Sequence, residues 1–395
     1  MKTVNSLFQP FSTISFQKQN RLFTLLAALG IISLMASCAG SKSPGSDKRT
    51  AALRDGDTVT IVTDSIDITP DSEEEEAEVP AWAAKKYNYN PARTLKTDLV
   101  HTKLEVSFDW KKRELNGIAT LTLKPWFYPQ NTVDLDAVGF IIKSVKQVKK
   151  KKSLKAKYTY DSTVLHITLD STYKRGQPYT LEIEYTARPE KLPKGGSAAI
   201  NSDKGLFFIN PDGTEPGKPR QIWTQGETQA NSKWFPTIDS PNERCTQEMH
   251  ITVDSSYRTL SNGSLSYSSF NPNGTRTDVW EQKLPHAPYL FMMAVGKFAV
   301  TTDKWKGMEV SYYTEPEYAK YARNIFGNTP EMIGFFSDRL GVKYPWAKYS
   351  QVVVRDYVSG AMENTSATVL MEAVQADDKE LADKSWDDII SHELF

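Results

Sequence analysis

Alternation of apolar and polar residues dominates the chain between about Leu95 and Ala299. The segments LVHTKLEVSFDW, LNGIATLTLKPW, STVLHITLD and YTLEIEYTA each alternate with period two and are rich in β-branched and aromatic residues. Turn residues separate such segments, and Asn116-Gly117 is predicted to be one of these breaks. We therefore expect a mainly β domain, an antiparallel sandwich or saddle-shaped sheet of about 200 residues.

The hydrophobic period changes near residue 316. EPEYAKYARNIF reads as a helix. Thr329 as N-cap and Pro330 as first helical residue predict the start of a second helix, which Gly341 ends. YSQVVV and SATVLM are predicted strands, and the segment Gly360–Asn364 lies between them. These patterns indicate a mixed domain of helices and strands.

A last helix is predicted at the C-terminal end of the sequence. Ser385-x-x-Asp388 has the pattern of a capping box, which would open a helix at about Trp386 that still continues at Phe395. We therefore expect this domain to be incomplete.

The N-terminal segment has the features of an export signal. Lys18 and Arg21 precede the apolar stretch LFTLLAALGIISLMA, whose length is too short to span a bilayer comfortably. The stretch ends in Met-Ala-Ser-Cys, which resembles a bacterial lipobox and predicts that Cys38 is acylated. An ordinary signal peptide that contains a cysteine is the alternative. We expect a lipid anchor in the bacterial cell envelope.

Four segments follow from these patterns. They are a lipoprotein signal peptide at 1–38, a disordered acidic linker at 39–90, the β domain at 91–303 and the mixed domain at 304–395. Cys245 would then be a lone thiol, with a role in packing.

Charge is balanced over the whole chain. The sequence holds 48 basic and 48 acidic residues, so no global attraction to nucleic acid is indicated. The run Lys149–Lys152 is predicted at an exposed edge or turn, where lysines discourage pairing between sheet edges. We expect no nucleic-acid partner.

The final residues His392-Glu393-Leu394-Phe395 supply four of the five positions of H-E-x-x-H. In that motif two histidines one helical turn apart grip a zinc ion, and the glutamate accepts a proton from a zinc-activated water. By itself such a pair is usually a surface feature.

A second motif changes this interpretation. Gly-Ala-Met-Glu-Asn at 360–364 lies about thirty residues before His392, and this arrangement resembles the aminopeptidase N family of zinc metallopeptidases. TQGETQANSKWFPTIDSPNERC, PYLFMMAVGKF and TPEMIGFFSDRLGVKYPWAKYSQVVVRDYVSGAMEN resemble further family segments. The likeness covers roughly residues 90 to 395, and it implies that residues 304–395 begin an α+β, thermolysin-like catalytic domain.

The resemblance also implies roles for single residues. His392 would be a zinc ligand and Glu393 the general base. Glu363 and Glu227 would bind the free α-amine of a peptide substrate, and Gln225 would line the same pocket. The substrate would lie along the remaining motif residues, which are Gly360, Ala361, Met362 and Asn364.

The resemblance reaches only part of the zinc site. The family's second histidine, its third ligand and its transition-state tyrosine have no counterparts in the printed sequence, so we expect a fragment of a longer enzyme. No ligand spacing links His101, His166, His250 and His286, which favours structural roles for them. The expected activity is removal of N-terminal residues from peptides. The alternatives are a family member with epoxide hydrolase activity and a non-catalytic envelope lipoprotein that binds through its β domain.

Overall fold

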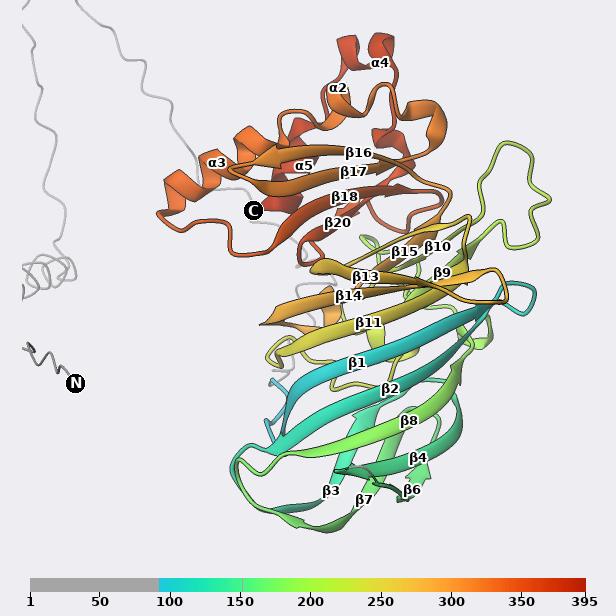
Figure 1. Ribbon diagram of the computed structural model, residues 1–395, viewed down its shortest axis with the longest axis vertical. Coiled ribbons are helices and arrows are strands. Elements are labelled where there is room, and N and C mark those ends of the chain that lie inside the picture. Colours follow the sequence, from blue (N-terminus) through green and yellow to red (C-terminus); the bar gives the residue numbers. More distant parts are fainter. Residues whose placement is uncertain (1–91, 151) are drawn as a thin grey trace, which may run out of the picture. The chain divides into compact units, whose positions relative to one another are not determined.

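A computed structural model of the chain describes residues 92–150 and 152–395 (Figure 1). The predicted signal peptide, with Cys38, and the whole predicted linker lie outside the described residues. Among the described helices, none combines the length and the apolar character that a membrane crossing requires.

The first part of the structure is built from strands, as the period-two pattern predicts. Its largest sheet has eight strands in the spatial order β13 (Ser264–Phe270), β14 (Thr275–His286), β11 (Cys245–Asp254), β1 (Thr97–Asp109), β2 (Glu114–Pro125), β8 (Tyr179–Ala187), β4 (Ile141–Lys149) and β5 (Lys152–Lys155). Alternate residues of β2 are fully buried, from Leu115 to Leu123, because the sheet presents one face to the core.

Two smaller sheets complete the β domain. One holds β3 (Gln130–Asp136), β7 (Val164–Tyr173) and β6 (Lys157–Tyr160), and the other β12 (Arg258–Ser261), β15 (Met293–Gly296), β10 (Gln221–Thr224) and β9 (Leu206–Ile209). The mainly β prediction is confirmed. One pair departs from the antiparallel expectation, because β1 and β11 run parallel, with His101 opposite Thr246.

The predicted turn at Asn116-Gly117 is wrong. Both residues lie inside β2, where Asn116 pairs with Ser107 and Gly117 with Val106 of β1. A Cβ built on Gly117 would stand 2.5 Å from Cζ of Tyr185, so the glycine makes room for a buried tyrosine ring on the neighbouring strand. Packing, rather than a turn, accounts for this glycine.

The second part carries a mixed sheet with helices. The strand order is β16 (Ala299–Trp305), β17 (Met308–Thr314), β18 (Lys348–Val354), β20 (Ala367–Met371) and β19 (Ala361–Met362), with parallel pairs only between β17, β18 and β20. Its helices are α2 (Ala322–Phe326), α3 (Thr329–Leu340), α4 (Asp378–Asp383) and α5 (Asp387–Leu394). The expected α+β arrangement is confirmed, and the sheet begins before the predicted boundary at residue 303.

Short 3-10 helices fill several connections. They are Pro189–Lys191, Asn231–Lys233, Pro288–Leu290, Pro316–Tyr318 and Glu372–Val374. The stretch predicted as a single helix near residue 316 is therefore a 3-10 turn followed by α2.

Helix α3 matches its prediction closely. It spans Thr329 to Leu340, so Thr329 is its first helical residue and Asn328 the cap, one position earlier than predicted. Gly341 ends the helix with a left-handed φ of 66°, a conformation that glycine adopts without steric cost.

Buried polar contacts join the two parts. The indole Nε1 of Trp223 in β10 donates to the carbonyl of Arg355, at 3.0 Å, and the amide N of Arg355 donates to Oε1 of Gln221, at 2.9 Å. Asn262 donates from Nδ2 to the carbonyl of Thr365 at 2.8 Å. These bonds hold the segment around residues 355–365 against the β domain.

Candidate active site

A cleft of about 730 Å³ opens beside the edge of the second sheet. Three segments that are far apart in the sequence form it: the loop after β10, the segment around β19, and α5. Its lining comprises Glu227, Ser359, Gly360, Ala361, Glu363, Asp388, Ile389, His392, Glu393 and Phe395. The structure thus brings most of the site residues predicted from the sequence into one cavity.

Strand β19 forms one wall and is an edge strand. Among the described strands its partner is β20 alone, with Ala361 opposite Leu370 and Met362 opposite Val369. Side chains alternate along the extended segment, so that Ala361 and Glu363 face the cleft while Met362 and Asn364 are buried. The outer edge of β19 is therefore available for a further extended chain.

The buried residues of this motif hold the edge in place. Asn364 is 2% exposed and donates from Nδ2 to the carbonyl of Leu290 in the β domain, at 3.3 Å. Its own carbonyl accepts the amide N–H of Ala367 at 2.9 Å. Asn364 and Met362 do not line the cleft, and their contact with a substrate stays a prediction.

Gly360, the residue before β19, lies close to α5. A Cβ built at this position would be 3.4 Å from Cδ1 of Ile389. The carbonyl of Gly360 accepts the amide N–H of Met371 at 3.1 Å, which continues the pairing with β20. The close approach at this glycine is made by a helix side chain of the same protein.

The loop after β10 contributes Glu227 and Gln225 in different ways. Glu227 lines the cleft, whereas Gln225 is 1% exposed and lies behind the wall. The Gln225 amide is engaged on both sides, since Oε1 accepts the Tyr357 hydroxyl at 2.9 Å and Nε2 lies 3.4 Å from Sδ of Met362. Direct contact of Gln225 with a substrate stays a prediction.

Gly226, between these two residues, was missed by the sequence reasoning. A Cβ there would stand 2.2 Å from the carbonyl oxygen of Tyr289 and 2.5 Å from Nδ2 of Asn231. Any larger residue would push the loop away from the β domain and move Glu227 with it.

Helix α5 carries the predicted zinc ligand and base. Ile390 is fully buried in the core of the second part, which fixes the rotation of the helix. Ile389 and Glu393 are four residues apart and therefore share a face, and His392 is adjacent on that face. Both His392 and Glu393 line the cleft, and His392 is exposed.

The predicted capping box of this helix is wrong. The N-cap is Trp386, and its side chain makes no capping hydrogen bond. The Ser385 hydroxyl instead accepts the amide N–H of Asp387 at 3.1 Å, one residue before the position a capping box requires. A complete capping box occurs at α4, between Asp377 and Glu380.

The cleft concentrates negative charge. None of the three carboxylates Glu227, Glu363 and Glu393 forms an ion pair with a side chain of the described residues. Burial, together with the charges of Glu363 and Glu227, raises the pKa of Glu393 to about 7. Burial and then the charge of Glu363 also raise the pKa of Glu227. Such a site favours a bound cation, because unpaired carboxylates in a partly desolvated cavity repel one another.

Two tyrosines near the cleft also escaped the sequence reasoning. Burial and the charges of Glu363 and Glu227 raise the pKa of Tyr289, and burial raises the pKa of Tyr357 well above its ordinary value. Tyr289 lies in PYLFMMAVGKF and Tyr357 just before Gly360, so both stand in segments that resemble the family, but the sequence alone assigned neither of them a role.

The cleft offers the types of side chain that bind zinc, but too few of them for a complete site. An imidazole and carboxylate oxygens are usual zinc ligands, and a catalytic site uses three protein ligands. Within residues 92–150 and 152–395, no group of three or more histidine, cysteine, aspartate or glutamate side chains has the geometry of a metal site. His392 is the one histidine that lines the cleft.

The other histidines and the described cysteine lie in the β domain. His101 bonds to Thr246 (Nδ1 to Oγ1, 2.7 Å), and both ring nitrogens of His286 are buried without a partner among the described residues. Cys245 is fully buried, with its Sγ 3.6 Å from the hydroxyl of Thr102, and burial raises the pKa of Cys245 to about 12. The packing role predicted for Cys245 is confirmed.

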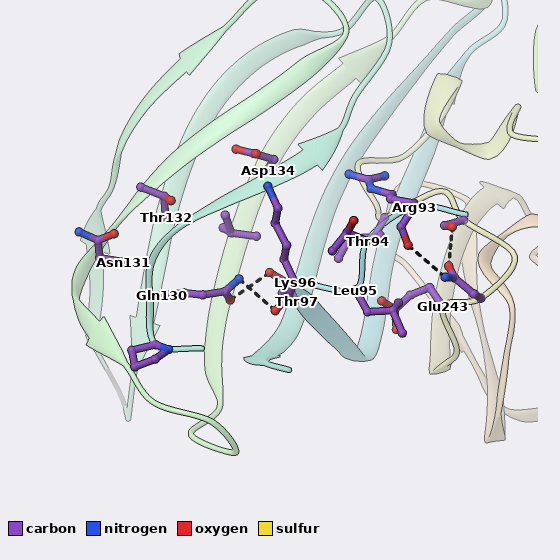
Figure 2. A pocket seen from close by; sticks show the side chains of 15 residues that line it. Arg93, Thr94, Leu95, Lys96, Thr97, Gln130, Asn131, Thr132, Asp134 and Glu243 are labelled. Carbon is purple, nitrogen blue, oxygen red and sulfur yellow. Dashed lines mark hydrogen bonds between the residues drawn. The ribbon is translucent and has the colours of Figure 1, made fainter. Parts of the chain in front are cut away.

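A separate cavity of about 400 Å³ lies in the β domain and is lined by none of the predicted site residues (Figure 2). Figure 2 shows Gln130 on one side, where Oε1 accepts the Thr97 hydroxyl at 3.0 Å and Nε2 donates to the carbonyl of Lys96 at 3.0 Å. Glu243 on the other side accepts the amide N–H of Leu99 at 3.2 Å, and burial raises the pKa of Glu243 to about 7. These contacts tie the start of β1 to its neighbours.

Comparison with known proteins gives consistent matches. The Peptidase M1 N-terminal domain family matches residues 86–290, and the Peptidase family M1 domain matches residues 325–395. Glutamyl aminopeptidase of Homo sapiens is 30% identical over 197 residues, which are 47% of this chain and 20% of that protein. The Bos taurus protein is 29% identical over 162 residues, or 40% of this chain and 17% of its own length. The chain thus spans about a fifth of the length of these relatives.

A solved structure of similar fold is a point mutant of a two-domain M1 zinc metallopeptidase bound to L-tryptophan. The TM-score is 0.58 at 19% sequence identity, and the match covers 74% of this chain and 64% of that chain. At this identity the likeness concerns the fold.

Proposed function

The chain belongs to the peptidase M1 family, and from this membership we propose that the full-length protein is a zinc-dependent aminopeptidase, which removes N-terminal residues from peptides. The observation that carries the proposal is the cleft, where α5, the segment around β19 and the loop after β10 bring His392, Glu393 and two further carboxylates together.

Glu227 and Glu363 would recognise the free amino terminus of the substrate. Both line the cleft, and neither has an ion-pair partner among the described side chains. A protonated α-amine between them would neutralise their mutual repulsion. A peptide without a free N-terminus would leave the two carboxylates unpaired in a partly buried site, so it would bind weakly.

The substrate backbone would extend β19. An extended peptide can add to an exposed strand edge through main-chain hydrogen bonds. Strand β19 is such an edge strand, and its residue Ala361 lines the cleft. This placement would direct the first peptide bond of the substrate toward α5, because the amine is held near Glu363.

Glu393 would move the proton. Glu393 lines the cleft next to His392, which places a carboxylate beside the proposed metal ligand. Glu393 would take a proton from the attacking water and later donate it to the leaving amine. When bound, zinc would supply acidification of water and polarisation of the scissile carbonyl. His392 would be one of the residues that hold the ion.

The cellular location is a further part of the proposal. The apolar stretch at 22–36 and the residues up to Cys38 support export and acylation in a bacterial envelope. Peptides in the envelope would then be the substrates.

The experiment is hydrolysis of aminoacyl-p-nitroanilides by the purified full-length protein. We expect turnover that a chelator abolishes and added zinc restores, with no turnover of the N-acetylated analogues. Absence of turnover by the zinc-loaded, folded protein would contradict the proposal and favour the non-catalytic alternative. Turnover of an epoxide without turnover of the anilides would favour the other alternative.

A further inference from the structure

Three turns lie side by side at one end of the eight-stranded sheet. Strands β2 and β4 both end beside the start of β8, since Leu123 pairs with Tyr179 and Val148 pairs with Thr180. The β2–β3 turn, the β4–β5 turn and the β7–β8 turn therefore share one end of the β domain. In Figure 1, β4, β7 and β8 lie at the end of the molecule opposite α3 and α5.

These turns carry positive charge without matching negative charge. Lys150, Lys152, Lys174 and Arg175 are exposed, and none of them forms an ion pair with a described side chain. Two acidic residues at this end of the sheet, Asp170 and Asp98, already form ion pairs with Lys149 and Lys124. The local excess of positive charge contrasts with the zero net charge of the chain.

Exposed aromatic rings stand among these cations. Phe127 is 55% exposed and Tyr128 is 82% exposed, both in the β2–β3 turn. The guanidinium carbon of Arg175 lies 5.7 Å from the centre of the Phe127 ring, so the aromatic and the basic turns are in contact. We call Phe127, Tyr128, Lys150, Lys152, Lys174 and Arg175 the basic-aromatic tip.

A broad hollow of about 1400 Å³ adjoins the tip. Lys150 and Lys152 line it together with Leu154, which is 47% exposed, and with Tyr173. The hollow therefore combines an apolar floor with a basic rim, and the alkyl stems of lysines can lie along such a floor.

We propose that the basic-aromatic tip docks the β domain on the surface of an anionic lipid bilayer. Cations near an anionic leaflet contribute about 1 kcal/mol each, and aromatic rings with a polar edge are stable at the level of the lipid headgroups. A sulfated polysaccharide would use the cations but offers no aromatic face that could stack on Phe127 and Tyr128. Docking at this end leaves the cleft, at the other part of the molecule, open to solvent.

Vesicle sedimentation tests the proposal without reference to peptidase activity. Every sample is the full-length chain without residues 1–38, so that neither the apolar stretch at 22–36 nor an acyl chain contributes. We expect binding to phosphatidylglycerol–phosphatidylcholine vesicles that 0.5 M salt weakens, and much weaker binding to pure phosphatidylcholine. Lys150→Gln with Lys152→Gln should lower the partition coefficient by about 25-fold, because 1 kcal/mol per cation is about fivefold.

Two matched controls isolate the tip. Lys111→Gln with Lys112→Gln changes two exposed lysines in the β1–β2 turn, at the opposite end of the same strands, and should leave the partition coefficient unchanged. Phe127→Ser with Tyr128→Ser should weaken vesicle binding about tenfold. Phe335→Ser replaces a ring on α3 that is 53% exposed, and it should leave vesicle binding unchanged.

Three results would overturn the proposal. One is equal binding by the parent and the lysine variant, and another is equal loss in the control variant of the β1–β2 turn. The third is binding to soluble heparin that needs the lysines but not the aromatic rings, since this outcome identifies a polyanion and not a bilayer as the partner.

Discussion

The Tyr357 hydroxyl donates a hydrogen bond to Oε1 of Gln225 at 2.9 Å, and this bond joins the segment before β19 to the loop that carries Glu227. The ring of Tyr357 also packs edge-on against Trp223 of β10, with 5.0 Å between ring centres. Two walls of the cleft, which come from different parts of the fold, are therefore connected behind the cleft by buried contacts.

Tyr357→Phe should loosen this connection while preserving the ring packing. The substitution leaves Oε1 of Gln225 buried without its donor, which costs about 1–3 kcal/mol of unfolding free energy. We also expect KM for a peptide substrate to rise more than kcat falls, because Glu227 loses its fixed position. Urea unfolding and steady-state kinetics on the full-length protein measure the two effects.

Tyr185→Phe is the matched control for that experiment. Tyr185 is fully buried, but its hydroxyl has no partner among the described residues. The same chemical change should therefore cost little stability and leave KM unchanged. An equal loss of stability in both variants would show that the Tyr357–Gln225 bond contributes nothing.

Lys348 should make the free energy of unfolding depend on pH above neutrality. It is buried at the start of β18, where Nζ donates to the carbonyl of Ser366 at 2.9 Å, and burial lowers the pKa of Lys348 from 10.5 to about 7. Between these values the unfolded chain binds the proton and the folded chain does not. The unfolding free energy should therefore rise with pH above 7, by at most about 1.4 kcal/mol per pH unit.

Lys348→Met tests this assignment. The carbonyl of Ser366 keeps a second donor, the amide N–H of Ser350 at 3.0 Å, so the substitution leaves no unpaired acceptor. The difference in unfolding free energy between the variant and the parent should shrink steadily from pH 7 to pH 9. A difference that is constant across this range would mean that Lys348 does not change its protonation on folding.

The sequence predicted the β domain and helix α3, but not the reason for every glycine. Period-two alternation identified the β domain because one face of each strand is buried, and that relation is local. Asn116-Gly117 was misread because a glycine inside a strand and a glycine in a turn look alike in sequence. The distinguishing partner, Tyr185, lies on a strand that begins more than sixty residues later.

Gly117→Ala tests whether Gly117 is needed to make room for the Tyr185 ring. The added Cβ would meet the Tyr185 ring at 2.5 Å inside the sheet, and overpacking of this kind costs about 1–3 kcal/mol. We expect Tyr185→Leu to be destabilising alone but to recover part of the loss when it is combined with Gly117→Ala. Additive losses in the double-mutant cycle of urea unfolding would contradict direct contact as the cause.

The sequence motifs predicted which residues belong to the candidate site, but not how those residues are arranged in space. Short motifs gave Glu363, His392 and Glu393 because each belongs to a compact pattern. The burial of Gln225 and its bond to Tyr357 depend on how two separate parts pack, which no local pattern encodes. The charge of the cleft also emerges only when three distant carboxylates are brought together.

Replacing Glu363 and replacing Glu393 should change different kinetic constants of the full-length protein. Glu363→Gln removes a charge that we assign to the substrate amine, so KM for a free-amine substrate should rise at least about tenfold. Glu393→Gln removes the proposed base, so kcat should fall by about 10²–10⁴ while KM changes little. Glu331→Gln, the same change at an exposed position in the first turn of α3, should alter neither constant.

Zinc content decides whether these roles are assigned correctly. Glu363 and Glu393 are proposed to contact substrate and water, so both glutamine variants should retain the zinc content of the parent by elemental analysis. His392→Ala should lose zinc, because the imidazole is the proposed ligand. Loss of zinc in folded Glu363→Gln would place that carboxylate on the metal, and the recognition of the substrate amine would then have to rest on Glu227 alone.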